Sequence, residues 1–236
     1  MAAEETAEDF PAGSFDRQEE TDDSFFYSQP RFVAHIDDYA IAAVGEAYRR
    51  FLAPGGKYLD LMSSWISHFP EDFPVDTLVG HGMNAEELAA NKRLTRWFIQ
   101  DLNKDPKLAL PDEIFDGVVV CVSVQYLTRP IEVFREVGRI LRPGRPFVVA
   151  YSNRCFPMKA IRMWQMLDDL DKGRLVATYM DDADCFDDAT IYDFSPRKTL
   201  FGVPKDNEKL AQAVADGSLY TDPLYVVVGN KKAHEE

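Results

Sequence analysis

The chain has 236 residues, of which 46% are hydrophobic, and its 40 acidic and 26 basic residues give a net charge of −14. This length fits one domain, and the charge argues against a nucleic-acid partner because a phosphate backbone would be repelled. No apolar run approaches the roughly 18–20 residues of a membrane span, so no membrane partner is expected.

The amino terminus is strongly acidic, because residues 1–23 hold nine acidic residues and the single base Arg17. Such a segment buries too little apolar surface to fold alone. We expect a disordered tail over residues 1–23 and one folded domain over residues 24–232. The acidic start is unlike a targeting peptide, and the three widely spaced cysteines suit a reducing compartment. A cytoplasmic location is therefore predicted, whereas the sequence carries no signal for an oligomeric state.

The first half of the domain alternates between helix and strand signals. Apolar residues at steps of three and four from Ile36 to Phe51 predict a helix over residues 32–52. The short apolar runs 57–62 and 77–80 predict two strands. Asn84 and Glu87, three residues apart, are typical of a capping box that opens a helix.

The middle of the chain continues this alternation. Residues 96–100 predict a third strand, and the unbroken apolar run 115–124 predicts a fourth that is buried on both faces of a parallel sheet. Pro130 opens a helix that ends at 142–144, and residues 146–151 predict a fifth strand.

The last third contains one helix signal and two strand signals. The helix has Ile161, Trp164, Leu167 and Leu170 on one face, and the strands cover residues 190–194 and 224–228. The alternation as a whole predicts a three-layer α/β fold around a mostly parallel sheet.

Polar side chains follow most of the apolar strands. In such sheets, ligands bind outside the carboxyl ends of the strands. The segments to consider lie directly after the five strands: residues 62–68, 81–84, 101–103, 123–126 and 152–154.

Three segments carry a family resemblance: Leu110 to Val119, Tyr126-Leu127, and Phe134 to Gly144 with its Arg-Ile-Leu-Arg-Pro-Gly ending. With them the sequence resembles the class I S-adenosylmethionine-dependent methyltransferases, most closely the methyltransferase type 11 branch. The resemblance implies a Rossmann-like, seven-stranded sheet whose last strand, 224–228, is antiparallel. It also implies S-adenosylmethionine as cofactor and a small-molecule methyl acceptor.

The cofactor motif of that family is only partly present. Asp60 matches the acid at the end of the first strand, but the three glycines that should follow are replaced by Met62, Ser64 and Ile66. Glycine allows a left-handed backbone there, and β-branched Ile66 is the worst substitute. The acid expected after the second strand aligns near Gly82, so His81, Asn84 or Glu86 would have to replace it.

Asp101 and Leu102 match the acid and neighbouring residue that recognise adenine in the family. The resemblance thus implies a cofactor site made of Asp60, Ser63, Ser64, Gly82, Met83, Asp101, Leu102 and Ser123. The alternative is local structure: Asp60 organising its own turn and Asp101 as an exposed loop acid.

The acceptor side is expected to include Tyr27, Arg31, Gln125 and Arg154, with His68 and Tyr126 as catalytic candidates. Relatives close a similar amino-terminal segment over the cofactor, and an arginine fork suits a carboxylate or phosphate. Three of these residues have a simpler interpretation: Arg31 as a solvated charge, Tyr126 as core, and His68 packed beneath Phe69.

Two functional hypotheses of different classes stand at this point. One is a methyltransferase with direct in-line transfer, and the other is a catalytically silent methyltransferase fold used for binding or scaffolding. An open cavity between Ser63 and Asp101 would favour the first, whereas filling by Met62 or Ile66 would favour the second. A nicotinamide-dependent oxidoreductase would need a GxGxxG motif after a strand, which the chain does not contain. No metal site is predicted, because the acidic run 181–188 lacks the glycine and glutamate of a calcium loop.

Overall fold

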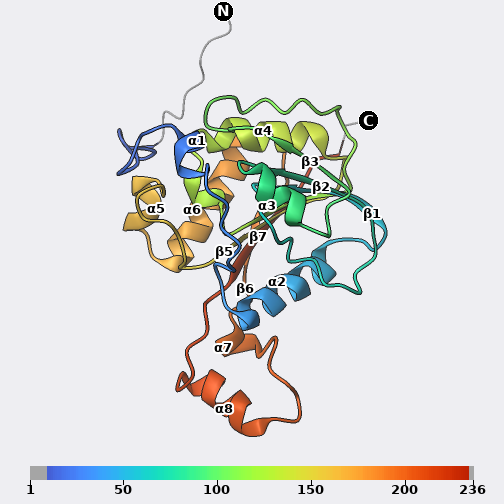
Figure 1. Ribbon diagram of the computed structural model, residues 1–236, viewed down its shortest axis with the longest axis vertical. Helices are drawn as coiled ribbons and strands as arrows, with labels where there is room; N and C mark the ends of the chain where they lie inside the picture. The colour runs from blue at the N-terminus through green and yellow to red at the C-terminus, as the bar shows by residue number, and fades with distance from the viewer. Residues whose placement is uncertain (1–9, 234–236) are drawn as a thin grey trace, which may run out of the picture.

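The computed structural model describes residues 10–233 (Figure 1). The predictions made for residues 1–9 lie outside this range. The elements in chain order are α1 (Asp23–Phe26), α2 (Asp38–Phe51), β1 (Gly56–Leu61), β2 (Val75–Gly82), α3 (Ala85–Ala90), β3 (Arg96–Ile99), β4 (Gly117–Cys121), the 3₁₀ turn η1 (Val124–Tyr126), α4 (Pro130–Ile140), β5 (Pro146–Tyr151), α5 (Arg162–Met166), α6 (Asp169–Ala183), β6 (Thr190–Asp193), α7 (Pro196–Thr199), α8 (Glu208–Asp216) and β7 (Tyr225–Asn230).

The strands form one seven-stranded sheet in the order β3-β2-β1-β4-β5-β7-β6. Strands β1 to β5 are parallel, and β7 pairs antiparallel with both β5 and β6. The predicted α/β fold with an antiparallel last strand is confirmed. The strand order reverses between β1 and β4, so the carboxyl ends of these two strands border the crevice where ligands bind in such folds.

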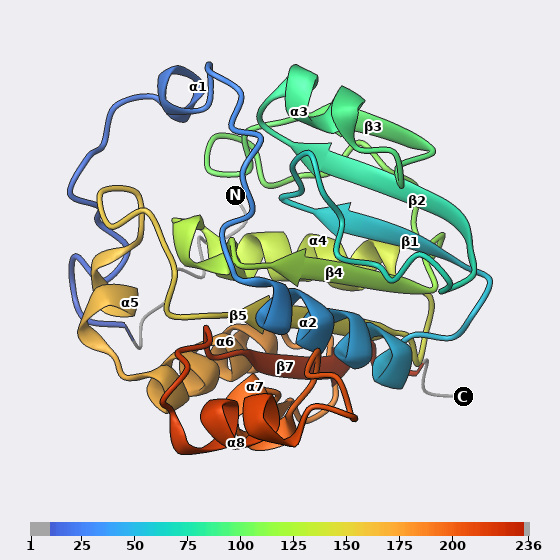
Figure 2. The same ribbon diagram turned by 60° about the horizontal axis from the view of Figure 1, so that its bottom comes forward.

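Helices cover both faces of the sheet (Figure 2), and a cluster of buried side chains lies on each face. Helices α4 and α6 pack together on one face, over the buried side chains of Phe134, Phe147 and Tyr179. Helix α2 lies on the other face and buries Val44 and Tyr48 there. The predicted three-layer arrangement is therefore observed. No helix within residues 10–233 has the length and apolar character needed to cross a bilayer.

Helix α2 begins later than predicted. The Asp37 side chain caps it by accepting a hydrogen bond from the Ala40 backbone N–H at 2.8 Å, which fixes the start at Asp38. Residues 27–36 are consequently not helical but run past the carboxyl ends of the strands toward α2 (Figure 2).

The connection between β1 and β2 is unusual. Parallel neighbours are generally joined through a crossover helix, but residues 62–74, all of which the structure describes, contain none. Phe69 and Phe73 from this connection are buried instead, and the Phe69 ring lies 4.7 Å from that of Tyr48 on α2. A pair of aromatic side chains thus covers part of a sheet face that a helix would usually cover.

Two predicted elements have different boundaries. Strand β4 ends at Cys121 rather than 124, because Val122 takes a left-handed backbone with φ of 51°. The predicted helix through Ile161 and Leu170 is two helices, α5 and α6. Asp168 separates them by accepting a hydrogen bond from the Asp171 N–H, which starts α6 anew.

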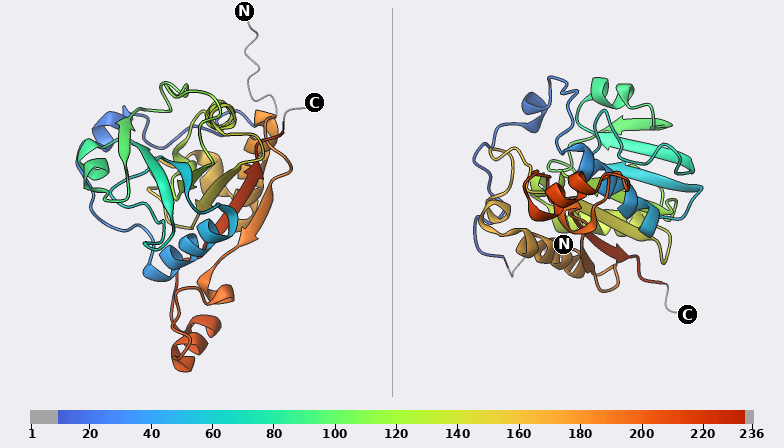
Figure 3. Two further views of the ribbon diagram at one scale, coloured as in Figure 1. Left: turned by 90° about the vertical axis from the view of Figure 1, so that its right-hand side faces the viewer. Right: turned by 90° about the horizontal axis from the view of Figure 1, so that it is seen from below.

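Residues 10–23 differ from the disordered tail that we expected. Ser14 and Asp23 are buried, and Arg17 pairs through the backbone with Ile161 ahead of α5. Residues 10–23 therefore pack against the folded body instead of lying outside it. Figure 3 shows the other extension of the body, the segment with α7 and α8 between β6 and β7, which projects away from the sheet.

Candidate functional site

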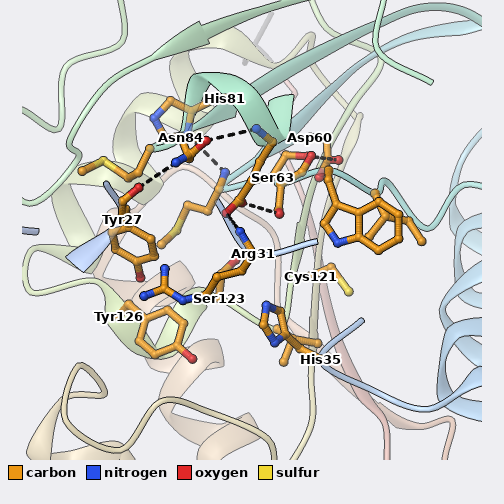
Figure 4. A pocket seen from close by; sticks show the side chains of 18 of the residues that line it. Tyr27, Arg31, His35, Asp60, Ser63, His81, Asn84, Cys121, Ser123 and Tyr126 are labelled. Atoms are coloured by element: carbon orange, nitrogen blue, oxygen red, sulfur yellow. Dashed lines mark hydrogen bonds between the residues drawn. The ribbon is translucent and has the colours of Figure 1, made fainter. Parts of the chain in front are cut away.

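A cavity of about 270 Å³ lies at the carboxyl ends of β1 to β4, under the segment 23–36 (Figure 4). Its volume is near the lower limit of small-molecule sites. Of the predicted site residues, all but one line it: Tyr27, Arg31, Asp60, Ser63, Ser64, His68, Gly82, Met83, Asp101, Leu102, Ser123, Tyr126 and Arg154.

The exception is Gln125, which does not line the cavity. Its side chain is buried and donates from Nε2 to the Val122 carbonyl at 3.0 Å. Its own carbonyl accepts a hydrogen bond from the Ile161 N–H at 3.0 Å. Gln125 therefore stabilises the turn after β4 and does not reach the cavity wall on which the sequence analysis placed it.

Asp60 ends β1 at the base of the cavity. Its Oδ2 accepts hydrogen bonds from the Ser63 hydroxyl at 2.6 Å and from the Ser67 hydroxyl. Burial raises the pKa of Asp60 to about 6, although the two hydroxyls act in the opposite direction. A buried acid that titrates near neutral pH in a cavity is a candidate functional group.

The loop after β1, in which Met62, Ser64 and Ile66 stand where the family has glycines, is strained at one position only. Of its three substituted positions, Met62 alone has a left-handed backbone, with φ of 59°; Ser64 and Ile66 do not. The expectation that Ile66 would fit worst was therefore wrong, because the chain never turns left-handed there. Met62 and Ile66 lie on the cavity wall without filling the cavity.

Strand β2 contributes a close approach of two backbones. A Cβ atom on Gly82 would lie 2.5 Å from the Ser63 carbonyl oxygen, so only glycine fits. No acid follows β2 at this point, but Glu87 on α3 reaches the cavity and is buried. Its Oε2 accepts from the Ser64 hydroxyl at 2.5 Å, and its Oε1 accepts from the Arg31 backbone N–H at 2.7 Å.

Glu87 is the residue that sequence reasoning missed as a site residue. It was assigned to a capping box with Asn84, while the exposed Glu86 was considered as a substitute acid. The Asn84 half of that box is present, because its Oδ1 accepts from the Glu86 and Glu87 N–H groups, both at 3.0 Å. The Glu87 carboxylate turns instead toward the amino-terminal segment, which the local spacing could not reveal.

Asn84 also holds this segment. Its Nδ2 donates to the Tyr27 carbonyl at 2.9 Å (Figure 4). Further along, the Trp65 indole N–H donates to the Val33 carbonyl at 3.1 Å. Three side chains from the sheet side, Asn84, Glu87 and Trp65, thus bind the backbone of residues 27–33 over the cavity.

Asp101 stands after β3 on the cavity wall. Its Oδ1 accepts a hydrogen bond from the Asn103 N–H at 3.0 Å, and its Oδ2 lies 3.7 Å from Lys104 Nζ. The carboxylate therefore organises its own turn and also faces the cavity. Both interpretations of this residue are compatible with the structure.

The end of β4 provides two hydroxyls. Ser123 is only 9% exposed, and its Oγ has no hydrogen-bond partner among the described residues. The Tyr126 hydroxyl accepts from the Phe156 N–H at 2.8 Å, and burial raises the pKa of Tyr126 to about 12. Tyr126 is thus a neutral hydrogen-bonding group at physiological pH.

Aromatic rings and an arginine form the opposite wall. The Arg31 guanidinium lies 4.4 Å from the centre of the Phe26 ring and 5.5 Å from that of Phe156. It donates to the Phe26 carbonyl at 2.8 Å. His68 lines the same cavity, and burial lowers its pKa to about 4, with a smaller effect from His35. His68 is therefore neutral near pH 7 and a weak base.

Arg154 lies at the rim with its side chain 55% exposed. Its Nε donates to Oδ1 of the buried Asp222 at 2.8 Å. Asp222 also accepts from the Asp37 N–H at 2.9 Å. The guanidinium is thus partly engaged in joining β5 to the segment before β7.

Comparisons with known proteins concern the sequence family and the fold. Residues 75–149 match the family model described as a methyltransferase domain. A curated relative, the biotin biosynthesis bifunctional protein BioHC of Teredinibacter turnerae, is 22% identical over 169 residues; the match covers 67% of this chain and 29% of that protein. The chain therefore spans less than a third of the relative's length.

Solved structures share the fold at low identity. An S-adenosylmethionine-dependent methyltransferase from Mesorhizobium loti superposes with a TM-score of 0.54 at 15% identity, over 80% of this chain and 98% of that one. The [4+2]-cyclase SpnF superposes with a TM-score of 0.55 at 15% identity, over 87% and 89% of the two chains. Since one of these two is a cyclase, the shared architecture does not by itself define a reaction.

Proposed function

We propose that this chain, a member of the class I S-adenosylmethionine-dependent methyltransferases by its fold and its methyltransferase-domain match, binds S-adenosylmethionine and methylates a small-molecule acceptor. The observation that carries the proposal is the cavity between Ser63 and Asp101. It collects the ends of four adjacent parallel strands at the point where the strand order reverses.

The residues present fit such a cofactor. Asp60 and Asp101 face the cavity at its β1 and β3 sides, and Gly82 lets the β2 and β1 turns approach closely. The buried Ser123 hydroxyl has no hydrogen-bond partner within residues 10–233 and is available to hydrogen-bond to a ligand. With Ser63, Ser64, Met83 and Leu102 these residues would hold the cofactor, which would supply a methyl group activated on a sulfonium.

The remaining wall suits an acceptor. Tyr27, Arg31, Tyr126 and His68 line it, and Arg154 stands at its rim. Because the pKa of His68 is low, its neutral ring would accept a hydrogen bond from the methyl-accepting substrate rather than remove a proton from that substrate. Residues 27–33, which lie over the cavity, are called the cover segment or cover. Rate acceleration would then come from proximity, alignment and the exclusion of water by this cover segment.

A second candidate is a binding protein without transferase activity. Three observations favour it: the three loop glycines are replaced, no acid stands directly after β2, and residues 62–74 contain no helix. Such a protein would keep the cavity for another ligand or use the fold as a scaffold.

Isothermal titration with S-adenosylmethionine and S-adenosylhomocysteine separates the two. The proposal expects saturable binding that Asp101→Ala weakens about tenfold, a change equivalent to one charged hydrogen bond. Asp105→Ala is the matched control, since Asp105 lies on the same loop and does not line the cavity. If neither compound at millimolar concentration produces binding heat or raises the melting temperature, the methyltransferase assignment is rejected and the scaffold is favoured.

A further inference from the structure

His81 connects the turns that follow β1 and β3 at the base of the cavity. Its Nδ1 accepts a hydrogen bond from the Met62 backbone N–H at 3.1 Å. Its Nε2 lies 3.0 Å from the Gln100 carbonyl oxygen. The ring is 1% exposed and packs 5.1 Å from that of Phe98. One side chain on β2 thus joins the end of β1 to the end of β3.

These two partners define the tautomer of His81. A carbonyl oxygen only accepts, so Nε2 carries the hydrogen, and an amide N–H only donates, so Nδ1 carries the lone pair. The imidazole is therefore neutral. A protonated ring would present an N–H to the Met62 N–H and lose that hydrogen bond, and burial indeed lowers the pKa of His81 to about 4.

Met62 is the place where this hydrogen bond matters. It occupies the first glycine position of the family motif and has the left-handed backbone that glycine adopts most easily, with φ of 59°. A residue other than glycine is strained in this region and stays there only where neighbouring groups stabilise that conformation. The His81 ring supplies a partner for the N–H of this residue.

The next residue is held from the same position. The His81 carbonyl accepts a hydrogen bond from the Ser63 N–H at 2.6 Å. Ser63 in turn donates its hydroxyl to Asp60. His81 therefore holds two consecutive backbone N–H groups of the turn, and the position of the Asp60 carboxylate depends on that turn.

We propose that His81 is a positioning residue: it compensates for the missing glycine at position 62 by holding Met62 in its left-handed backbone conformation. It thereby fixes the part of the cavity wall against which the cofactor would lie. The ligand part of this inference rests on the proposed function. The structural part, that the ring holds the turn, concerns the protein without ligand and can be tested separately.

The structural test is amide hydrogen exchange of Met62 and Ser63 in the ligand-free protein. His81→Leu removes the acceptor and should raise the exchange rate of Met62 at least about tenfold. His81→Asn places its side-chain oxygen near the position of Nδ1 and should keep most of the protection. Equal protection of Met62 in wild type and His81→Leu would overturn the inference.

The binding test is a double-mutant cycle read by titration with S-adenosylhomocysteine. We expect His81→Leu to weaken binding about tenfold, and His81→Leu/Met62→Gly to recover most of that loss, because glycine needs no support at this φ. Phe186→Leu, at the far end of the sheet, should lower thermal stability without changing affinity. An additive double mutant would overturn the coupling, whereas failure of the wild type to bind would reject the proposed function and leave hydrogen exchange to decide the role of His81.

Discussion

The Nζ atom of Lys159 lies 3.0 Å from Oδ1 of Asp23, and the two side chains are 0% and 6% exposed. Arg17 and Asn103 also donate to the Asp23 carboxylate, at 2.8 Å and 3.0 Å. Burial would raise the pKa of Asp23, but these donors outweigh it and the pKa is lowered. This buried ion cluster fastens the amino-terminal segment to the region after β5.

Replacing Asp23 with alanine should therefore destabilise the whole domain. Removing one partner of a buried ion pair costs about 3–5 kcal/mol, because the other charge stays buried. We expect a loss of this order in the free energy of unfolding in urea. Arg174→Ala breaks an exposed pair with Asp171 and should cost less than about 1 kcal/mol. Similar losses in the two variants would contradict a structural role for Asp23.

The same cluster explains why composition misled the prediction for residues 10–23. A run of acids is normally solvated and disordered, but here Glu19 and Asp23 both pair with Lys159, which is more than 130 residues away in the sequence. Nothing near Lys159 in the sequence indicates a buried lysine. Long-range charge pairing is invisible to local composition.

The sheet, in contrast, was readable from the sequence. Strands β1 to β5 are apolar runs with polar residues at their carboxyl ends, and this pattern alone located most of the cavity wall. The family resemblance implied an amino-terminal segment over the cofactor, but the contacts that hold this segment were not readable, because the partners of Glu87 and Asn84 are backbone groups of Arg31 and Tyr27. Backbone groups are the same at every position, so a sequence pattern does not identify them. The single helix predicted around Leu167 failed because the Asp168 cap interrupts it.

The raised pKa of Asp60 predicts that cofactor binding depends on pH. The pKa of about 6 means that the carboxylate form dominates at pH 7 and is lost below pH 6. If the charged form orients the cofactor's amino group, affinity for S-adenosylmethionine should fall as pH drops from 7 to 5. Titrations across this range should show the fall in wild type and its absence in Asp60→Asn. A parallel pH profile in the two proteins would exclude Asp60 as the titrating group.

The buried histidines predict an acid-side loss of stability. Burial lowers the pKa of both His68 and His81 from 6.5 to about 4. The folded state therefore binds fewer protons than the unfolded state, so their contribution is complete above pH 6.5 and is lost as pH falls toward 4. Asp60 changes in the opposite direction, because its raised pKa favours the folded state at low pH.

The measurement is therefore a difference between proteins at each pH. The melting temperature of His68→Leu should decrease less than that of wild type between pH 6.5 and 4, and His81→Leu should behave in the same way. Asp60→Asn is the opposite control and should steepen the decrease. Superimposable slopes in wild type and both histidine variants would show that the two rings titrate normally in the folded protein.

The hydrogen bonds of Glu87 are expected to keep the cover segment closed over the cavity. Its two oxygens accept from different donors, the Arg31 N–H and the Ser64 hydroxyl, and the amide of Glu87→Gln has only one oxygen to offer. Losing one hydrogen bond to a charged acceptor is worth about 1.5–3 kcal/mol, or roughly tenfold or more in the population of the open cover. Trypsin cleavage after Arg31 should accelerate by about this factor, because cleavage follows the open population when closing is fast.

Glu86→Gln is the matched control, since this neighbour on α3 is exposed and its carboxylate has no part in the cover. Its cleavage rate after Arg31 should equal that of wild type, as followed by mass spectrometry of the released fragment. Saturating S-adenosylhomocysteine should slow cleavage of both wild type and Glu87→Gln, because a ligand beneath the cover stabilises the closed form. Equal acceleration in both variants would mean that the loss of negative charge on α3, and not the hydrogen bond to Arg31, opens the segment.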